Sequence, residues 1–313
     1  MNFLKKIRKK FYRLIFRPSK PCFWLGYRYL KNKISLSKED IAIISIHNAG
    51  ETYLLCAMAR HFKKLHKIKG KIILLGTKSY HRQIYKMFAH DVGGYYQLDP
   101  YIAECLKPLR TIKSGEIFYC ADHDLWTSSF LKPPLTHFSL LKMCNFIEGD
   151  IVLSKPEIAL EVVLSAKEKF KNLGLLENKT IFISPESTSL KALNKEFWED
   201  LCGKFIKLGY EVFYNVVDQK NIPANAKSKF LNFSEALVFA NLCGNIVSSR
   251  SGLCEVISSS SANLHILYPT KQSIAVYSMK EISTAKQSLF EYACDENSSE
   301  ALMQNILRNY TSY

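Results

Sequence analysis

The chain has 313 residues, 47% of them hydrophobic and 12% aromatic, with a mean hydropathy of -0.08 and a formal net charge of +15. This composition excludes a disordered chain and allows one large domain or two of ordinary size. No apolar run approaches the ~18–20 residues of a membrane-spanning helix, and charges interrupt every apolar stretch near the N-terminus, so we expect no cleavable signal.

The positive charge is concentrated at the N-terminus. Residues 1–38 contain twelve Lys or Arg and no acidic residue, which leaves 31 basic and 28 acidic residues in the rest of the chain. A protein that binds nucleic acid through its folded domains spreads basic residues over them. The nearly neutral body therefore argues against a nucleic-acid partner.

The first predicted element is a basic amphipathic helix in MNFLKKIRKKFYRLIFRPSK, which Pro18 ends. Apolar residues recur at helical spacing and cations occupy the other side, a pattern suited to the anionic inner face of the cytoplasmic membrane. The segment PCFWLGYRYLK continues the mixture of aromatic and basic residues. We expect residues 1–33 to contact that surface and the protein to be cytoplasmic and peripheral there. A helix packed on its own protein is the alternative.

From Glu39 onward, short apolar runs alternate with helical patterns, which is typical of parallel α/β structure. In the first half we predict strands over 41–46, 71–76 and 116–120, each followed by a helix, around 47–66, 79–90 and 135–146. A charged segment over 154–179 then leads into a helix that ends near Gly174.

The same pattern restarts in the second half, with strands over 180–185, 210–217, 245–249 and, as the last, 264–269. We predict helices over 194–209, closed by Gly209, over 234–244, capped by Ser234, from 252, and at the C-terminus from 299. The fold class is α/β, with two Rossmann-like domains that face a cleft. The domains are 39–170 and 171–295, after a leader of 1–38. The helix predicted in 296–313 is a candidate to pack back on the first domain.

In open α/β sheets, ligands lie beyond the carboxyl ends of the strands. After the strand over 245–249 come Arg250, Ser251, Gly252 and Leu253, at the head of a helix. Unpaired amides and the helix dipole favour an anion there, Gly252 allows close approach, and Arg250 can bind phosphate oxygens in a fork. A pyrophosphate site is one interpretation; a structural cap with Arg250 in a surface ion pair is the other.

A second polar loop, SPESTSLK, follows the strand over 180–185. Its hydroxyls are Ser184, Ser187, Thr188 and Ser189. Lys191 adds a cation, and Glu186 is able to accept hydrogen bonds from a ribose. Alone, this loop reads as an ordinary helix cap, but two such loops at one sheet edge favour a nucleoside diphosphate.

The loop HNAGETYL follows the first strand. Gly50 permits a tight turn, and Glu51 stands where a helix begins. Glu51 is therefore a candidate general base that removes a proton from the hydroxyl of an acceptor substrate. His47 is the rival base and Asn48 lies on the acceptor side. Alternatively, Glu51 only stabilises the first helical turn.

The segment ADHDLW contains Asp122-His123-Asp124, a loose DxD pattern whose two carboxylates are of the kind that holds a divalent metal ion. Such short matches are frequent by chance. We expect Asp122 and His123 to contact the acceptor or to lie in a surface loop, and we predict no metal. The nine cysteines are scattered, never spaced Cys-x-x-Cys, and typical of free thiols in a reducing cytosol. No P-loop, HExxH or GxSxG motif is present.

Two segments, IFISPESTSLKALNKEFWEDLCGKFIKLGYEVFYNVVD and LNFSEALVFANLCGNIVSSRSGLCEVI, resemble the C-terminal half of GT-B glycosyltransferases related to bacterial heptosyltransferases. These enzymes act in lipopolysaccharide or capsule assembly. The segment IAIISIHNAGETYLLCAMARHFKK is similar to their first strand, loop and helix, and the resemblance spans roughly residues 40–270.

The resemblance implies that Ser184, Lys191, Arg250, Ser251 and Gly252 surround the donor. It implies Glu51 as the base, where heptosyltransferases carry an aspartate. The family's Asp-Thr-Gly is replaced here by SRSG, and its glycine-rich first loop keeps only Gly50, so ADP-heptose does not follow as the donor.

We therefore expect a metal-independent, inverting glycosyltransferase with no cofactor. It would move a sugar from a nucleotide-diphosphate sugar, held by the second domain, to a glycan or lipid-linked glycan of the bacterial surface, held by the first. The alternatives are a nucleotide-sugar epimerase or hydrolase of the same fold, and a non-catalytic, membrane-docked nucleotide-binding protein.

Overall fold

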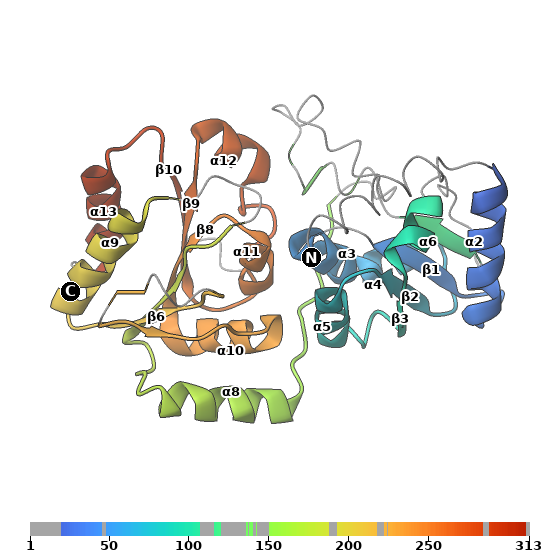
Figure 1. Cartoon of the computed structure of the whole chain (residues 1–313), viewed down its shortest axis with the longest axis horizontal. Coiled ribbons are helices and arrows are strands. Elements are labelled where there is room, and N and C mark those ends of the chain that lie inside the picture. The colour runs from blue at the N-terminus through green and yellow to red at the C-terminus, as the bar shows by residue number, and fades with distance from the viewer. Residues whose placement is uncertain are drawn as a thin grey trace, which may run out of the picture.

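The chain folds around two separate parallel β-sheets that lie at opposite ends of its long axis (Figure 1). This computed structural model describes residues 20–45, 48–106, 116–119, 136, 138–139, 142, 150–187, 193–217, 222–223, 225–283 and 288–310. Most of the predicted leader, residues 1–19, lies outside the described residues, as does nearly all of the helix expected over 135–146.

The first sheet has the strand order β3-β2-β1-β4, with every pair parallel. Its strands are β1 (Ile41–Ser45), β2 (Ile72–Gly76), β3 (Gly94–Gln97) and β4 (Glu116–Tyr119). All five residues of β1 are buried, because helices cover both faces of the sheet. The continuous apolar run that predicted this strand is therefore explained by its central place.

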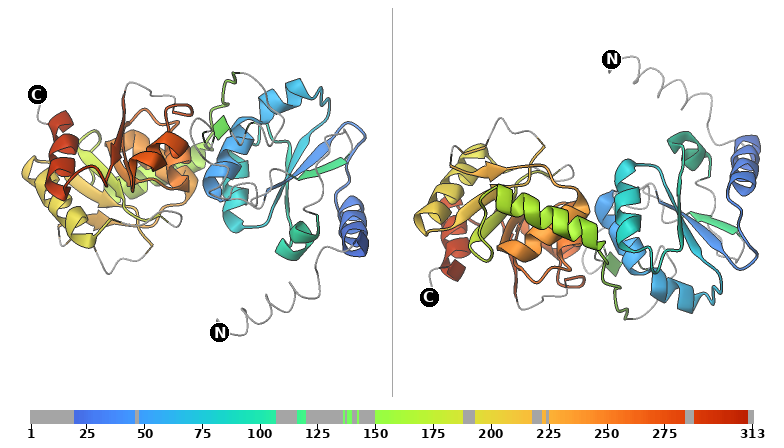
Figure 2. Two further views of the ribbon diagram at one scale, coloured as in Figure 1. Left: turned by 90° about the horizontal axis from the view of Figure 1, so that it is seen from above. Right: turned by 90° about the horizontal axis from the view of Figure 1, so that it is seen from below.

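Alternate residues of β1 enter two different hydrophobic clusters. On one face Ile41 and Ile43 pack with the helices α3 (Ala49–Ala57), α4 (Ala59–Leu65) and α5 (Ser79–Met87). On the other face Ala42 and Ile44 pack with α2 (Lys20–Lys33) and α6 (Pro100–Cys105). Views from above and below show these two layers on either side of the sheet (Figure 2).

The second sheet has the order β10-β9-β8-β5-β6-β7, again all parallel. Its strands are β5 (Thr180–Ser184), β6 (Glu211–Tyr214), β7 (Lys227–Ser228), β8 (Gly244–Ser249), β9 (Asn263–Tyr268) and β10 (Leu289–Ala293). Its helices are α8 (Leu160–Asn172), α9 (Lys195–Lys207), α10 (Phe233–Cys243), α11 (Gly252–Ile257), α12 (Lys271–Tyr277) and α13 (Ser299–Leu307), followed by a 3-10 turn over Arg308–Tyr310. Helix α8 packs edge-on through its Phe170 against Phe239 of α10.

The two sheets share one continuous hydrophobic cluster. It joins side chains of α3 and α5, such as Tyr53 and Ile84, to side chains of α10 and α11, such as Leu237 and Val256. Phe233 at the start of α10 also meets Tyr80 edge-on, with ring centroids 6.4 Å apart. The two halves are therefore in direct apolar contact.

Several sequence-based boundaries agree with the structure, and three details are corrected. Gly174 and Gly209 close their helices with positive φ angles of 65° and 83°. Asn232, not Ser234, caps α10, because its side chain accepts a hydrogen bond from the Glu235 amide in a capping box.

The strand over 264–269 is not the last one. β10 pairs with β9 and forms an edge of the sheet, and its half-buried LFEYA segment lacks the apolar run of a central strand. The C-terminal helix α13 packs on α9 through Leu302, Met303 and Ile306, within its own half, rather than on the first domain. In the part of the chain that the structure describes, no helix is both long and apolar enough to cross a membrane.

Candidate active site

The two halves meet where the first turns of α3 and α11 lie against each other (Figure 1). A Cβ atom on Gly252 would lie 2.9 Å from the backbone nitrogen of Gly50, and one on Gly50 would lie 2.7 Å from the carboxyl carbon of Glu255. A side chain at Gly252 would collide with backbone, and one at Gly50 would have to displace the Glu255 carboxylate that Arg250 holds. The two loops predicted to face each other across a cleft are therefore in contact.

Arg250 and Glu255 form a buried ion pair at this junction. Their side chains are 7% and 2% exposed, and the Arg250 Nη1 donates to Glu255 Oε2 over 2.9 Å while Nη2 donates to Oε1. Burial by itself would lower the pKa of Arg250, but the neighbouring Glu255 carboxylate outweighs it and raises that pKa above its ordinary value. The guanidinium is therefore charged.

The remaining contacts of Arg250 fix it to the backbone of its own half. Nε donates to the Tyr277 carbonyl over 3.1 Å, and Nη1 also donates to the Ser251 carbonyl over 2.8 Å. The ion pair that the sequence left open as an alternative thus exists, but it is buried rather than on the surface. A phosphate that binds Arg250 must share or replace the contact with Glu255.

The two predicted donor loops are joined by a hydrogen bond. The hydroxyl of Ser187 donates to the Arg250 carbonyl over 2.9 Å. The carbonyl of the buried Ser184 accepts from Ser248 over 3.2 Å, and the exposed Glu186 accepts from the Val217 amide over 3.2 Å. Parallel strands β5 and β8 are neighbours, so their carboxyl ends bring these loops to one edge, as predicted.

Glu51 lies in the first turn of α3 and is half-buried. Its charge affects the pKa of side chains in both halves. Burial raises the pKa of Tyr277, on α12, and the charge of Glu51 raises it further, whereas Arg250 lowers it. Burial raises the pKa of Tyr80 to about 12, with Glu51 again adding to the effect. The charges of Glu51 and Arg250, one from each half, therefore both act on Tyr277.

The loop after β2 completes the surroundings of Glu51. Partial desolvation lowers the pKa of Lys78, and the charge of Glu51 opposes that change. The Lys78 ammonium lies 5.3 Å from the centre of the Tyr80 ring. The buried His81 holds this loop, since its Nδ1 accepts from the Thr77 amide over 3.0 Å and from the Lys78 amide over 3.3 Å.

Sequence reasoning missed four residues of this arrangement: Lys78, Tyr80, Glu255 and Tyr277. A signal existed for the first two, because they follow the buried strand β2 at the same carboxyl edge as Glu51. Glu255 gave a weaker signal, as an acid five residues after an arginine at the start of a short apolar helix. Tyr277 stands at the end of α12 and had none.

The other predicted site residues are distributed as follows. Asn48 is exposed and its carbonyl accepts from the Thr52 amide and hydroxyl, and Leu253 packs against the shared hydrophobic cluster. His47, Lys191, Thr188, Ser189, Asp122, His123 and Asp124 lie outside the described residues. Among the residues that are described, no group of three or more His, Cys, Asp or Glu is placed to hold a metal ion.

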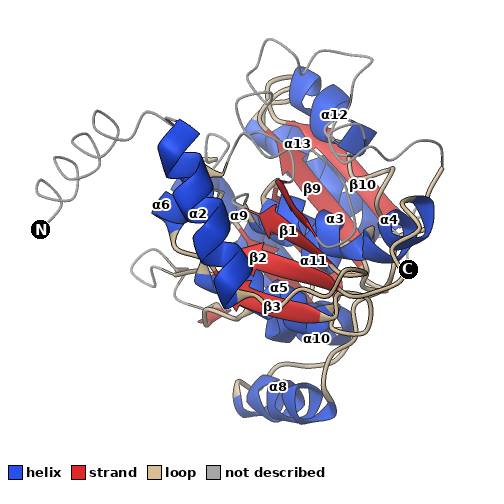
Figure 3. Cartoon of the chain, turned by 90° about the vertical axis from the view of Figure 1, so that its right-hand side faces the viewer, coloured by secondary structure: helices blue, strands red, loops and turns tan. Residues whose placement is uncertain are grey.

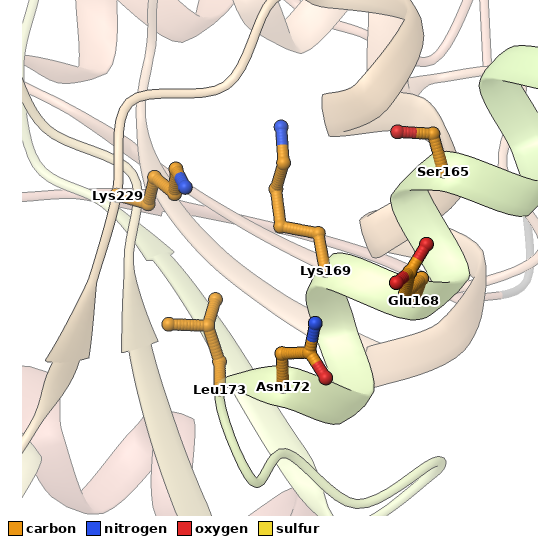
Figure 4. A pocket seen from close by; sticks show the side chains of 6 residues that line it. All are labelled: Ser165, Glu168, Lys169, Asn172, Leu173 and Lys229. Carbon is orange, nitrogen blue, oxygen red and sulfur yellow. The ribbon is translucent and has the colours of Figure 1, made fainter.

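A surface pocket lies elsewhere, between α8 and the segment after β7 (Figure 4). Its volume is about 300 Å³, and it is lined by Ser165, Glu168, Lys169, Asn172, Leu173 and Lys229. Lys169 forms an ion pair with Glu235, so its positive charge is already neutralised. None of the predicted site residues lines this pocket, so the junction remains the candidate site.

No family model and no curated protein matches the chain. Several solved structures are similar in fold to this chain. The structure of the glycosyl transferase of family 9 from Veillonella parvula superimposes with a TM-score of 0.56 at 13% identity, over 90% of this chain and 93% of that one. The E. coli ADP-heptose lps heptosyltransferase II is similar with a TM-score of 0.58 at 12% identity, over 87% and 98%.

A third solved structure has a different chemistry in its name. The putative UDP-N-acetylglucosamine 2-epimerase from Listeria monocytogenes has a TM-score of 0.51 at 8% identity, over 88% of this chain and 89% of that one. At such identities the likeness concerns the fold alone. The chain thus has a glycosyltransferase-like fold of the GT-B type, as the sequence resemblance implied.

Proposed function

We propose that this protein is a glycosyltransferase that moves a sugar from a nucleotide-diphosphate sugar to a bacterial surface glycan. One observation supports this most: Gly50, which precedes Glu51 in the first half, lies against Gly252 and against the Glu255 carboxylate that binds Arg250 in the second half. A base and an anion-binding loop on opposite sides of one site suit displacement at a sugar carbon.

In the proposed reaction, Glu51 takes the proton of an acceptor hydroxyl as its oxygen attacks the anomeric carbon. The bond from that carbon to the diphosphate breaks, and the nucleoside diphosphate leaves with the electron pair. A single displacement inverts the anomeric configuration. His47 is the alternative base.

The leaving diphosphate requires positive charge and amide donors, which we assign to Arg250, Lys191, Ser251 and Gly252. Because Gly252 lies against Gly50, no phosphate fits between the two helix starts as they stand. Donor binding at these residues would therefore separate α3 from α11, a hinge motion of the kind common between two lobes. No metal ion is needed in this scheme, so chelation with EDTA should leave activity intact.

Donor and acceptor are proposed as classes. The donor is a nucleotide-diphosphate sugar, with Ser184, Glu186 and Ser187 on its nucleoside side; SRSG in place of the family's Asp-Thr-Gly leaves the heptosyl subtype unassigned. The acceptor is a glycan or lipid-linked glycan at the inner face of the cytoplasmic membrane, which the basic residues 1–33 contact.

The experiment begins with thermal unfolding of the full chain in the presence of ADP, UDP, GDP or CDP. A rise in Tm with one of them identifies the base, and the matching sugar nucleotides are then incubated with and without glycan acceptors. Transfer that occurs only with an acceptor is the expected product pattern. A protein whose Tm responds to no nucleotide would be a scaffold, and the proposal would be lost.

A second candidate function is epimerisation or hydrolysis of a sugar nucleotide. The likeness to a putative UDP-N-acetylglucosamine 2-epimerase favours it, because that protein shares the fold. Such an enzyme needs no glycan acceptor. A rearranged or hydrolysed sugar in the reaction without acceptor would select this function.

A further inference from the structure

Helix α2 has two sides of opposite character. On its inner side Leu30 is fully buried, and Ile34, directly after the helix, is 6% exposed; both belong to the hydrophobic cluster that includes Ala42 and Ile44 of the first sheet. Gly26 lies close to α6, since a Cβ there would be 3.6 Å from the Cβ of Cys105. The helix is therefore docked firmly, and its orientation about its own axis is set by this packing.

The outer side of α2 exposes large apolar residues to solvent. Trp24 is 64%, Leu25 70% and Tyr29 44% exposed. With 3.6 residues per turn, these positions share one half of the helix with the exposed cations Arg28 and Lys31. We call this set of five residues the α2 outer face.

The aromatic and basic side chains of α2 lie beside one another. The ammonium of Lys31 lies 5.6 Å from the ring centre of Tyr27, and that of Lys33 lies 6.0 Å from the ring centre of Tyr29. Trp24 meets Tyr27 edge-on, with centroids 6.2 Å apart. Aromatic rings with cations at their rim are the composition that proteins place at the level of lipid headgroups.

We propose that the α2 outer face lies on an anionic phospholipid surface and is the folded part of the membrane contact. This proposal assigns specific residues to the membrane contact given under the proposed function, and what it implies for the acceptor rests on that function. Residues 1–38 contain no acidic residue, so their charge is complementary to anionic headgroups. A second copy of this face would instead bring like charges together in a two-fold contact, which disfavours dimerisation.

This placement also orients the molecule. α2 lies on the outermost side of the first half (Figure 3), on the sheet face opposite to α3. The order from the lipid outward is then α2, the first sheet, α3, α11 and the second sheet. The donor half faces away from the bilayer, and the fitting acceptor is a lipid-linked glycan whose reacting end extends past the headgroups.

The test is co-sedimentation of the full chain with vesicles of phosphatidylcholine alone or mixed with phosphatidylglycerol. We compare the unchanged protein with the double variant Trp24→Ser, Leu25→Ser. Removing two apolar side chains from a lipid interface should weaken binding to the anionic vesicles roughly tenfold or more. The variant Arg28→Gln, Lys31→Gln should weaken binding to anionic vesicles and leave binding to phosphatidylcholine unchanged.

The matched control is Leu160→Ser, Leu164→Ser on α8. These leucines are 69% and 58% exposed, so they resemble Trp24 and Leu25 in apolar exposure but lie on the second half. The control should bind within twofold of the unchanged protein. Equal binding by the Trp24→Ser, Leu25→Ser variant, or an equal loss in the control, would overturn the assignment.

Sedimentation velocity without lipid distinguishes the other occupant. A dimer that the Trp24→Ser, Leu25→Ser variant dissociates would replace the membrane with a second copy of the chain. Nucleotide-dependent Tm shifts are measured on the same variants and should be unchanged. A chain that binds vesicles through α2 but responds to no nucleotide would defeat the proposed function and leave the docking surface standing.

Discussion

The two halves of the molecule differ in how their site loops are held. In the second half, Arg250 is fixed by a carboxylate and two carbonyls, and Ser187 ties the neighbouring loop to it. In the first half, the charge of the half-buried Glu51 acts on Tyr80, and His81 holds the adjoining loop through its Nδ1. The predicted anion-binding loop of the second half is thus held rigidly, with Arg250 engaged by a carboxylate that a diphosphate would have to share or displace.

The largest expected effect comes from breaking the ion pair of the second half. Arg250→Met would leave the Glu255 carboxylate buried without its partner, so the free energy of unfolding should fall by about 3–5 kcal/mol. The double variant Arg250→Met, Glu255→Leu should recover most of that loss, because no charge remains buried. Denaturant unfolding measures both, and a loss below about 1 kcal/mol in the single variant would contradict a central role for the pair.

The contact between the halves is tested by Gly50→Ala. The new methyl group would meet Glu255, which Arg250 holds in place, so unfolding should become easier by about 1–3 kcal/mol. Gly203→Ala on α9 is the matched control, since nothing lies within 4 Å of its Cβ position. There alanine should stabilise the helix by about 0.5–1 kcal/mol. Two variants of equal stability would mean that the helices do not touch.

A smaller, pH-dependent effect comes from a histidine in the core of the second half. His265 stacks on Phe290 and Tyr292, and burial lowers its pKa from 6.5 to about 3. Between those values the unfolded chain binds a proton that the folded chain does not, so stability falls as the pH falls from 6.5 toward 3.

The variant His265→Phe keeps the stacked ring without the titration. Below pH 6.5, the unchanged protein should lose up to about 1.4 kcal/mol of stability per pH unit more than the variant does. The difference in slope, measured by denaturant unfolding at several pH values, is insensitive to any packing change. Parallel slopes would show that His265 takes up its proton in the folded state.

The architecture was predictable because the buried central strands appear in the sequence as continuous runs of apolar residues. The runs at Ile41 and Thr180 gave strands within a residue of their ends. β3, β7 and β10 were missed because edge or near-edge strands are half-exposed and lack that run. The two polar loops at one edge followed from strand order, which parallel α/β structure largely determines.

The sheet edge that carries the candidate site was predictable from the sequence, but the contacts made there were not. Carboxyl ends of strands point to Glu51 and Arg250, whereas the pairing of Arg250 with Glu255 depends on which way a short helix turns its fourth residue. The contact of Gly50 with Gly252 depends on how two halves dock, and no local pattern encodes that. Tyr277 enters the site only because α12 ends beside Arg250.

The most direct test of the account is the rate of sugar transfer by Glu51→Gln, with the donor that the nucleotide panel identifies. This change removes the base and keeps the shape of the side chain, so turnover should fall about a hundredfold or more while the nucleotide-induced Tm shift is unchanged. Full turnover in the variant, with folding intact, would contradict the claim that the first half supplies the base and the second half holds the leaving group.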